Sequence, residues 1–133
     1  MASRAIPIPG GELEQAVLAA VWELGGASAP DIHARVGEPR GLAYTTTAKV
    51  LDRLCAKRLV RRLRQGKSFF YTPAQPRELI ETARVKDSLR RLLGADPKPA
   101  IATLVDALEK VDPALLDELT RLVNARRRSR DGS

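Results

Sequence analysis

Basic side chains gather in one stretch of the sequence, and the chemistry they offer is the binding of phosphate. Residues 40–67 contain nine lysines and arginines but a single acidic residue, in a 133-residue chain whose formal net charge is +7. Lysine and arginine neutralise the phosphates of nucleic acids, and a concentrated basic patch supplies non-specific affinity and steers association. This stretch therefore indicates a partner such as duplex DNA.

The first half of the basic stretch is predicted to be a helix from Ala43 or Tyr44 to Lys57. The polar face of this helix carries Thr45, Thr46 and Lys49 near the N-terminus. Threonine hydroxyls and a lysine ammonium can bond to base edges in the major groove, or to phosphates. The buried side is marked by an apolar stripe at helical spacing, formed by Thr47, Val50, Leu51 and Leu54.

The second half is predicted to be a β-hairpin with strands at Leu59–Arg64 and Ser68–Thr72. Gly66 in the connection supplies the positive φ that a tight hairpin requires. Phe69 and Tyr71 share one face by the period of two, and we expect both to pack on the helices. The basic residues of the hairpin are then expected to reach the phosphate backbone, which fixes register without reading sequence.

Two further helices are predicted before the basic stretch. The first is Gly11–Leu24, with Gly25-Gly26 as its stop, and the second is Ala29–Val36, capped by Ser28 and ended by Gly37 and Pro39. Helix, short helix, polar helix and hairpin make a winged helix-turn-helix. We therefore predict a flexible arm over residues 1–10 and a DNA-binding domain over residues 11–75. Its expected DNA contacts are Arg40, Tyr44, Thr45, Thr46, Lys49, Arg53, Arg62, Arg64 and Lys67.

Residues 76–126 are predicted to form three helices, at 77–93, 97–110 and 113–126. Asp96-Pro97 and Asp112-Pro113 are both start signals, with a capping aspartate and proline at the first helical position. Three helices of this size expose more aliphatic surface than they can bury alone, so a second copy of the chain is the expected partner. The fold class is mainly α with a small β wing, and residues 127–133 are predicted to be a disordered basic tail. The expected dimerisation residues are Leu89, Leu93, Ile101, Leu104, Val105, Leu108, Leu115, Leu119 and Leu122.

Several motifs resemble the penicillinase-repressor family, which includes β-lactamase and methicillin-resistance repressors. They are Gly11-Glu12-Leu13-Glu14 with Val17, Val21 and Trp22, then Leu42-Ala43-Tyr44-Thr45-Thr46, Val50-Leu51-x-Arg53-Leu54, Lys57-x-Leu59-Val60 and Gly66-Lys67-x-Phe69-x-Tyr71-x-Pro73. The resemblance covers residues 11–73, and the later helices match only in pattern. It implies a winged helix, a helical dimerisation domain and repression at inverted-repeat operators, often with TACA/TGTA half-sites.

The sequence departs from this family at three points. Regulated members are cleaved by a sensor protease at an Asn-Phe bond, but the only asparagine here, Asn124, precedes Ala125, so a regulatory protease partner is in question. One cysteine, Cys55, excludes the Cys-rich metal motif of copper-responsive relatives. Winged helices commonly place Gly or Asn at the position of Arg58, so either slight backbone strain or a different turn is expected there.

Other function classes find little support in the residues. One histidine and one cysteine leave no nucleophile–base pair and no metal-ligand cluster, so we predict no enzyme activity and no cofactor. The longest apolar runs are far shorter than a membrane span, which predicts a cytoplasmic protein with no membrane partner. The main prediction is a homodimeric transcriptional repressor that binds a palindromic DNA operator. The alternatives are a winged-helix protein-interaction module and a non-specific architectural DNA binder.

Overall fold

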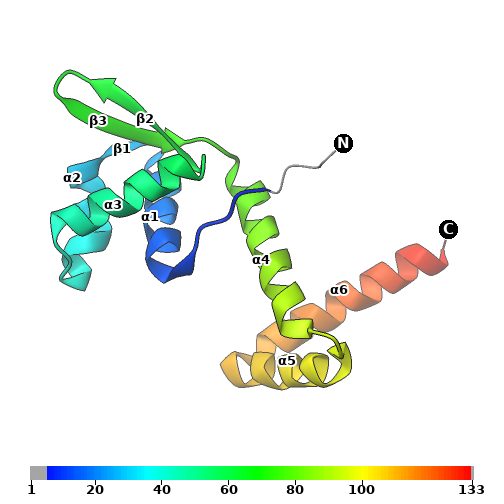
Figure 1. Cartoon of the computed structure of the whole chain (residues 1–133). Coiled ribbons are helices and arrows are strands. Elements are labelled where there is room, and N and C mark those ends of the chain that lie inside the picture. The colour runs from blue at the N-terminus through cyan, green and yellow to red at the C-terminus, as the bar shows by residue number, and fades with distance from the viewer. Residues whose placement is uncertain (1–5, 133) are drawn as a thin grey trace. The chain divides into compact units, whose positions relative to one another are not determined.

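The computed structural model describes residues 6–132 of the chain (Figure 1). They form two compact units that divide between Asp87 and Ser88, inside a helix, whereas the sequence suggested a division near residue 75. The first unit holds three helices, a three-stranded sheet and the start of a fourth helix. Of the arm predicted over residues 1–10, the first five residues lie outside the described part, and Pro9 is buried.

Helix α1 spans Gly11–Leu24, the bounds predicted from the sequence. Its C-terminus is closed by two backbone hydrogen bonds of 3.2 Å, from Gly25 N–H to the Trp22 carbonyl and from Gly26 N–H to the Val21 carbonyl. This pairing requires a left-handed residue directly after the helix, and Gly25 supplies it with a φ of 68°. The buried side chains of the helix are Val17, Leu18, Ala20 and Val21.

The second helix is longer and less regular than predicted. It begins as α2, Ala29–Ile32, with the Ser28 hydroxyl accepting a hydrogen bond of 3.3 Å from Asp31 N–H. It continues as a π-helical turn over His33–Gly37 and a 3₁₀ turn over Glu38–Arg40. The predicted stop at Gly37 is therefore wrong, because this glycine keeps a right-handed helical backbone.

Helix α3 spans Tyr44–Ala56 and buries Thr47, Val50, Leu51 and Leu54, the four residues of the predicted stripe. After it, Leu59 N–H donates to the Leu54 carbonyl over 2.9 Å and Arg58 N–H donates to the Cys55 carbonyl over 3.0 Å. The turn repeats the one that follows α1, but its left-handed position is held by Arg58, with a φ of 62°. The strain expected at this residue is confirmed, since a left-handed backbone costs a non-glycine residue about 1–2 kcal/mol.

We expect Arg58→Gly to raise the free energy of unfolding by about 0.5–1 kcal/mol. Glycine relieves the left-handed strain, although its greater freedom in the unfolded chain cancels part of the gain. Urea unfolding at one fixed protein concentration measures the change. Ala56→Gly, at the end of α3, is the matched control and should lower stability by a similar amount. A loss of stability in Arg58→Gly would contradict the prediction.

Strands β2, Val60–Gln65, and β3, Ser68–Pro73, form the predicted hairpin. A third strand, β1, consists of Ala27–Ser28 alone and was not predicted, because two residues show no periodicity. The sheet is antiparallel with the order β1–β3–β2, and Figure 1 shows it lying over α1 and α3. We call the β2–β3 hairpin the wing.

The core of the first unit lies between α1, α2, α3 and the sheet. It is built mainly from leucine, valine, isoleucine and alanine. Helix α4, Arg77–Leu93, joins this core through its first turns, where Ile80 is buried. The Trp22 ring packs against the core and faces the Arg77 guanidinium at 5.2 Å.

The second unit contains the end of α4 and two further helices, α5, Pro97–Val111, and α6, Pro113–Asp131. Helices α5 and α6 pack against each other. Asp96 accepts a hydrogen bond from Lys98 N–H and Asp112 accepts one from Ala114 N–H, which confirms both predicted caps. Helix α6 continues to Asp131, so the prediction of a disordered tail from residue 127 is wrong there. Nothing between residues 124 and 131 breaks a helix, since neither Gly nor Pro occurs.

Candidate nucleic-acid interface

The exposed face of α3 presents the side chains expected to reach DNA bases. Thr45, Lys49 and Arg53 are exposed and Thr46 is half-buried. Neither Lys49 nor Arg53 has an ion-pair partner among residues 6–132, so the Lys49 ammonium and the Arg53 guanidinium are available for a ligand. Hydroxyls beside an available cation at a helix N-terminus suit contacts to base edges and to phosphates together.

The start of α3 is held in place by a contact with the preceding helical segment. His33 Nδ1 and Thr47 Oγ1 lie 2.7 Å apart and share a partly buried hydrogen bond. The His33 ring also meets the Tyr44 ring edge-on, with 5.5 Å between centroids. Gly37 lies against both partners, and a Cβ on it would overlap His33 Nδ1 and Thr47 Oγ1. Sequence patterns assigned neither His33 nor Gly37 this role, because the contact joins separate helices.

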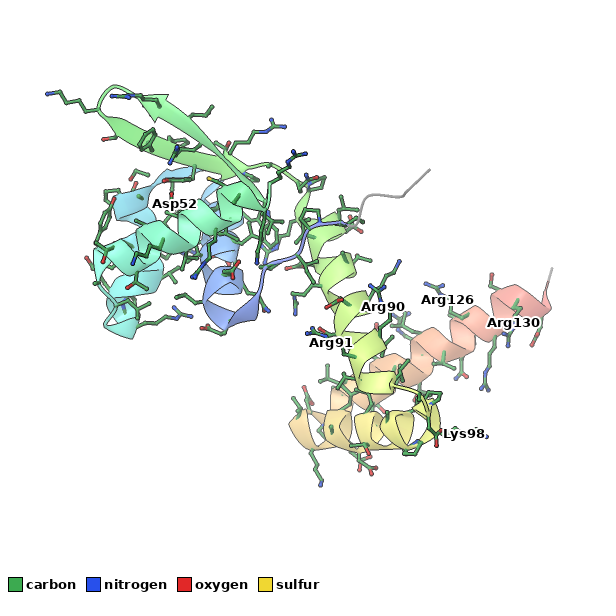
Figure 2. The ribbon with its side chains drawn as sticks, viewed as in Figure 1. Asp52, Arg90, Arg91, Lys98, Arg126 and Arg130 are labelled. Atoms are coloured by element: carbon green, nitrogen blue, oxygen red, sulfur yellow. The ribbon has the colours of Figure 1, made fainter. Side chains whose placement is uncertain are left out.

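Some of the basic residues expected to contact DNA have partners within the chain. Arg40 donates to Glu12 Oε1 at 2.7 Å and to the Val36 carbonyl at 3.1 Å. Arg62 lies 3.6 Å from Asp52 Oδ1, and Figure 2 shows Asp52 on the side of α3 that faces the wing. The basic stretch is therefore partly neutralised, by Asp52 within the stretch and by Glu12, which lies far from it in the sequence.

The end of the wing carries the remaining predicted contacts. Lys67 is exposed and has no ion-pair partner in the described part of the chain. Arg64 is exposed and donates through Nε to the Gly66 carbonyl at 3.2 Å. This bond to the hairpin turn restrains the Arg64 side chain and leaves its charge unneutralised. Both cations remain suited to phosphate contacts.

The expected packing of the wing aromatics holds for one ring and is wrong for the other. Tyr71 is buried, but Phe69 is 40% exposed and Leu63 is 49% exposed. Phe69 lies two residues nearer the turn than Tyr71, beyond the cover of the helices. The Phe69 ring contacts two arginines of the wing. The guanidinium carbons of Arg62 and Arg64 lie 4.4 and 5.9 Å from the ring centroid.

Two titratable groups lie beside this part of the wing. Burial raises the pKa of the Tyr71 hydroxyl, and a hydrogen bond from Arg62 opposes part of that rise. Burial also raises the pKa of the half-buried Cys55 thiol, which therefore stays protonated at neutral pH and is a poor nucleophile. Cys55 packs against the core, as expected of a small apolar residue.

Comparison with known proteins agrees with this geometry. A family model described as penicillinase repressor matches residues 10–125. The chain belongs to the penicillinase repressor family. Transcriptional regulator BlaI of Mycobacterium tuberculosis, found in two strains, is 31% identical over 112 residues, which cover 84% of this chain and 80% of the relative.

The likeness extends to a solved structure. The solution structure of the DNA-binding domain of the repressor BlaI matches with a TM-score of 0.50 and 20% identity, covering 56% of this chain and 90% of that one. This likeness concerns the fold, and it confirms the predicted winged helix. The penicillinase repressor relatives are transcriptional regulators rather than enzymes, and the present family member is a regulator of the same kind.

The penicillinase repressor family member described here leaves much apolar surface open in its second unit. No side chain of residues 88–132 is fully buried in the single chain, and Ile101 is 50% exposed. Among the residues predicted to dimerise, Leu93, Val105, Leu108 and Leu119 are half-buried, and Leu89, Ile101, Leu104, Leu115 and Leu122 are exposed.

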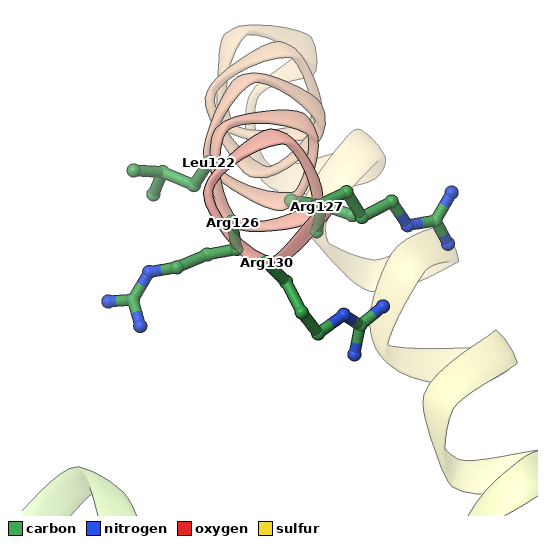
Figure 3. Close-up of a pocket in the computed structure, with 5 residues that line it drawn as sticks. Leu122, Arg126, Arg127 and Arg130 are labelled. Atoms are coloured by element: carbon green, nitrogen blue, oxygen red, sulfur yellow. The ribbon is translucent and has the colours of Figure 1, made fainter. Parts of the chain in front are cut away.

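Arginines crowd the last turns of α6. Arg126, Arg127 and Arg130 line a shallow groove with Leu122 and Val123, and Figure 3 shows the three arginines leaving the helix in different directions. All five lining residues belong to one helix, so no second element of the described chain walls the groove. In residues 6–132 there is also no cluster of residues able to hold a metal ion, and none of the helices there could span a membrane.

Proposed function

We propose that this family member is a homodimeric repressor that binds a palindromic operator, with α3 in the major groove and the wing on the phosphate backbone. The observation that carries the proposal is the exposed face of α3, where Thr45, Lys49 and Arg53 stand together and both cations lack an internal partner among residues 6–132. A winged helix presents such a face to base edges. The protein would act where the chromosome is, in the cytoplasm.

The open apolar surface of the second unit supports the homodimer. Monomeric proteins rarely expose large contiguous apolar patches, and a second copy covers such a patch with an identical one. Two-fold symmetry places two recognition helices about one DNA turn, roughly 34 Å, apart and so matches an inverted repeat. The partner in this proposal is therefore a second copy of the chain acting on duplex DNA.

Lys49→Ala is expected to weaken binding to the cognate operator by about 1–3 kcal/mol if Lys49 reads a base. Binding to a scrambled duplex should change much less, because that complex lacks the specific contact. Fluorescence anisotropy with both duplexes measures the two affinities. Lys57→Ala, at the other end of α3 and paired with Glu14 at 2.8 Å, is the control and should affect both duplexes alike. An equal reduction of affinity for both duplexes in Lys49→Ala would instead make Lys49 a phosphate contact.

Selection of bound genomic fragments by the purified protein at two salt concentrations tests the proposed function. An enriched inverted repeat with half-sites about 10 base pairs apart supports the dimeric repressor. Uniform binding that vanishes at the higher salt would favour the non-specific architectural alternative, since phosphate contacts alone carry that dependence. Absence of DNA binding at either salt would favour a protein-interaction module.

A further inference from the structure

We propose that Arg62 is a positioning residue that joins the wing to the recognition helix, rather than a phosphate contact. Its guanidinium lies between two groups of the same chain, the Asp52 carboxylate on α3 and the Phe69 ring on β3. We call Asp52, Arg62 and Phe69 the wing latch. The inference deepens the proposed function and rests on it only for the second of the two measurements below.

The register of the wing produces this arrangement. Arg62 pairs with Tyr71 across β2 and β3, and Arg64 pairs with Phe69. Residues directly opposite in an antiparallel pair lie on the same face, so these four side chains share the face that carries buried Tyr71. Arg62 therefore projects toward the helices, where Asp52 lies, while its neighbour Arg61 projects from the opposite face of the sheet.

The contacts of Arg62 differ in kind from those of the other wing cations. The ion pair with Asp52 connects the strand to the exposed side of α3, and the guanidinium carbon lies over the Phe69 ring, 4.4 Å from its centroid. Exposed ion pairs and cation–π contacts are each weak, but here one side chain makes both and joins separate elements. The tip of the wing has no other ion pair to the helices among the described residues.

The latch also explains an acidic residue on a DNA-facing helix. Asp52 lies one turn after Lys49 on α3 and would repel phosphates if its charge were left alone. With Arg62 beside it, the pair presents little net charge to the DNA, and the predicted wing contacts that remain to bind phosphates are Arg64 and Lys67. The angle between wing and helix then decides whether these two reach the backbone while α3 occupies the groove.

The first measurement needs no DNA. Amide hydrogen exchange in β2 and β3, followed by NMR on the free protein, compares Arg62→Gln, Asp52→Asn and the double variant. We expect each single variant to speed exchange of the wing amides about two- to five-fold, consistent with weak surface contacts. The double variant should be no faster than the singles. Arg61→Gln, which removes the same charge from the opposite face, should leave exchange unchanged.

Either of two outcomes overturns the latch. In one, Arg62→Gln and Asp52→Asn exchange no faster than Arg61→Gln. In the other, their effects simply add in the double variant, which would show that the two side chains act independently.

The second measurement uses the duplex recovered by the genomic selection. We expect Arg62→Gln to weaken binding a few-fold at every salt concentration without changing the slope of log K against log salt. Lys67→Gln, as a phosphate contact, should reduce the magnitude of the slope by about 0.9 for each phosphate that the protein no longer neutralises. A slope reduced equally by Arg62→Gln would make Arg62 a phosphate contact and refute the inference. Failure of the wild-type protein to bind DNA would refute the proposed function, while the exchange experiment would still decide the latch.

Discussion

Leu104→Asp is expected to yield monomers and to weaken operator binding by about two orders of magnitude or more. Leu104 lies on the apolar face of α5 and is 37% exposed in the single chain, so the proposed dimer would bury it. An unpaired carboxylate in that position costs several kcal/mol. Loss of the second recognition helix removes the gain in avidity, which can reach about 10²–10⁴. Sedimentation equilibrium and anisotropy with the operator duplex measure the two effects.

Ala102→Asp is the matched control for this variant. Ala102 is exposed on the same helix, two residues away and therefore on nearly the opposite side. It should leave both the mass in solution and the operator affinity close to wild type. Leu119→Asp on α6 should behave like Leu104→Asp. Dimers of unchanged stability in both leucine variants would show that these helices do not form the interface.

Gly37→Ala is expected to destabilise the protein by about 1–3 kcal/mol, although alanine is the better helix former. Gly37 has a right-handed backbone, so alanine meets no conformational penalty there. The penalty is steric, because the added methyl group occupies the space of the His33–Thr47 hydrogen bond. Urea unfolding at constant protein concentration measures the loss.

A second substitution separates the steric cause from other effects. His33→Ala removes one of the two groups that the new methyl group would strike, while Thr47 Oγ1 stays, so Gly37→Ala should cost less in a His33→Ala background. This non-additivity is the signature of two groups competing for one space. Equal costs in the two backgrounds would mean that the close approach of the His33 ring does not contribute to the cost of a side chain at position 37.

The elements that could be predicted from the sequence are those with strong local signals. The Asp-Pro starts of α5 and α6, the glycine pair after α1 and the regular stripe of α3 each depend on neighbouring residues alone. The winged helix followed from their order. The strain at Arg58 was also visible, because the turn after α3 demands a left-handed residue whatever occupies it.

The site was harder to predict because its electrostatics depend on residues far apart in sequence. Arg40 pairs with Glu12, 28 positions away, and a count of charges within residues 40–67 could not reveal it. Period two placed Phe69 and Tyr71 on one face correctly, but it carries no information on how far the helices cover that face. The sequence predicts a stop at Gly37 because the residue type alone does not distinguish a flexible glycine from one required by close packing.

The single tryptophan of the chain gives this protein an intrinsic optical reporter. Trp22 lies where α1 meets the first turns of α4, with the Arg77 guanidinium over its ring and its buried indole N–H without an acceptor in the described structure. Its emission therefore depends on how α4 is seated on the winged helix. A change that loosens this seat would therefore shift the fluorescence spectrum of the unlabelled protein.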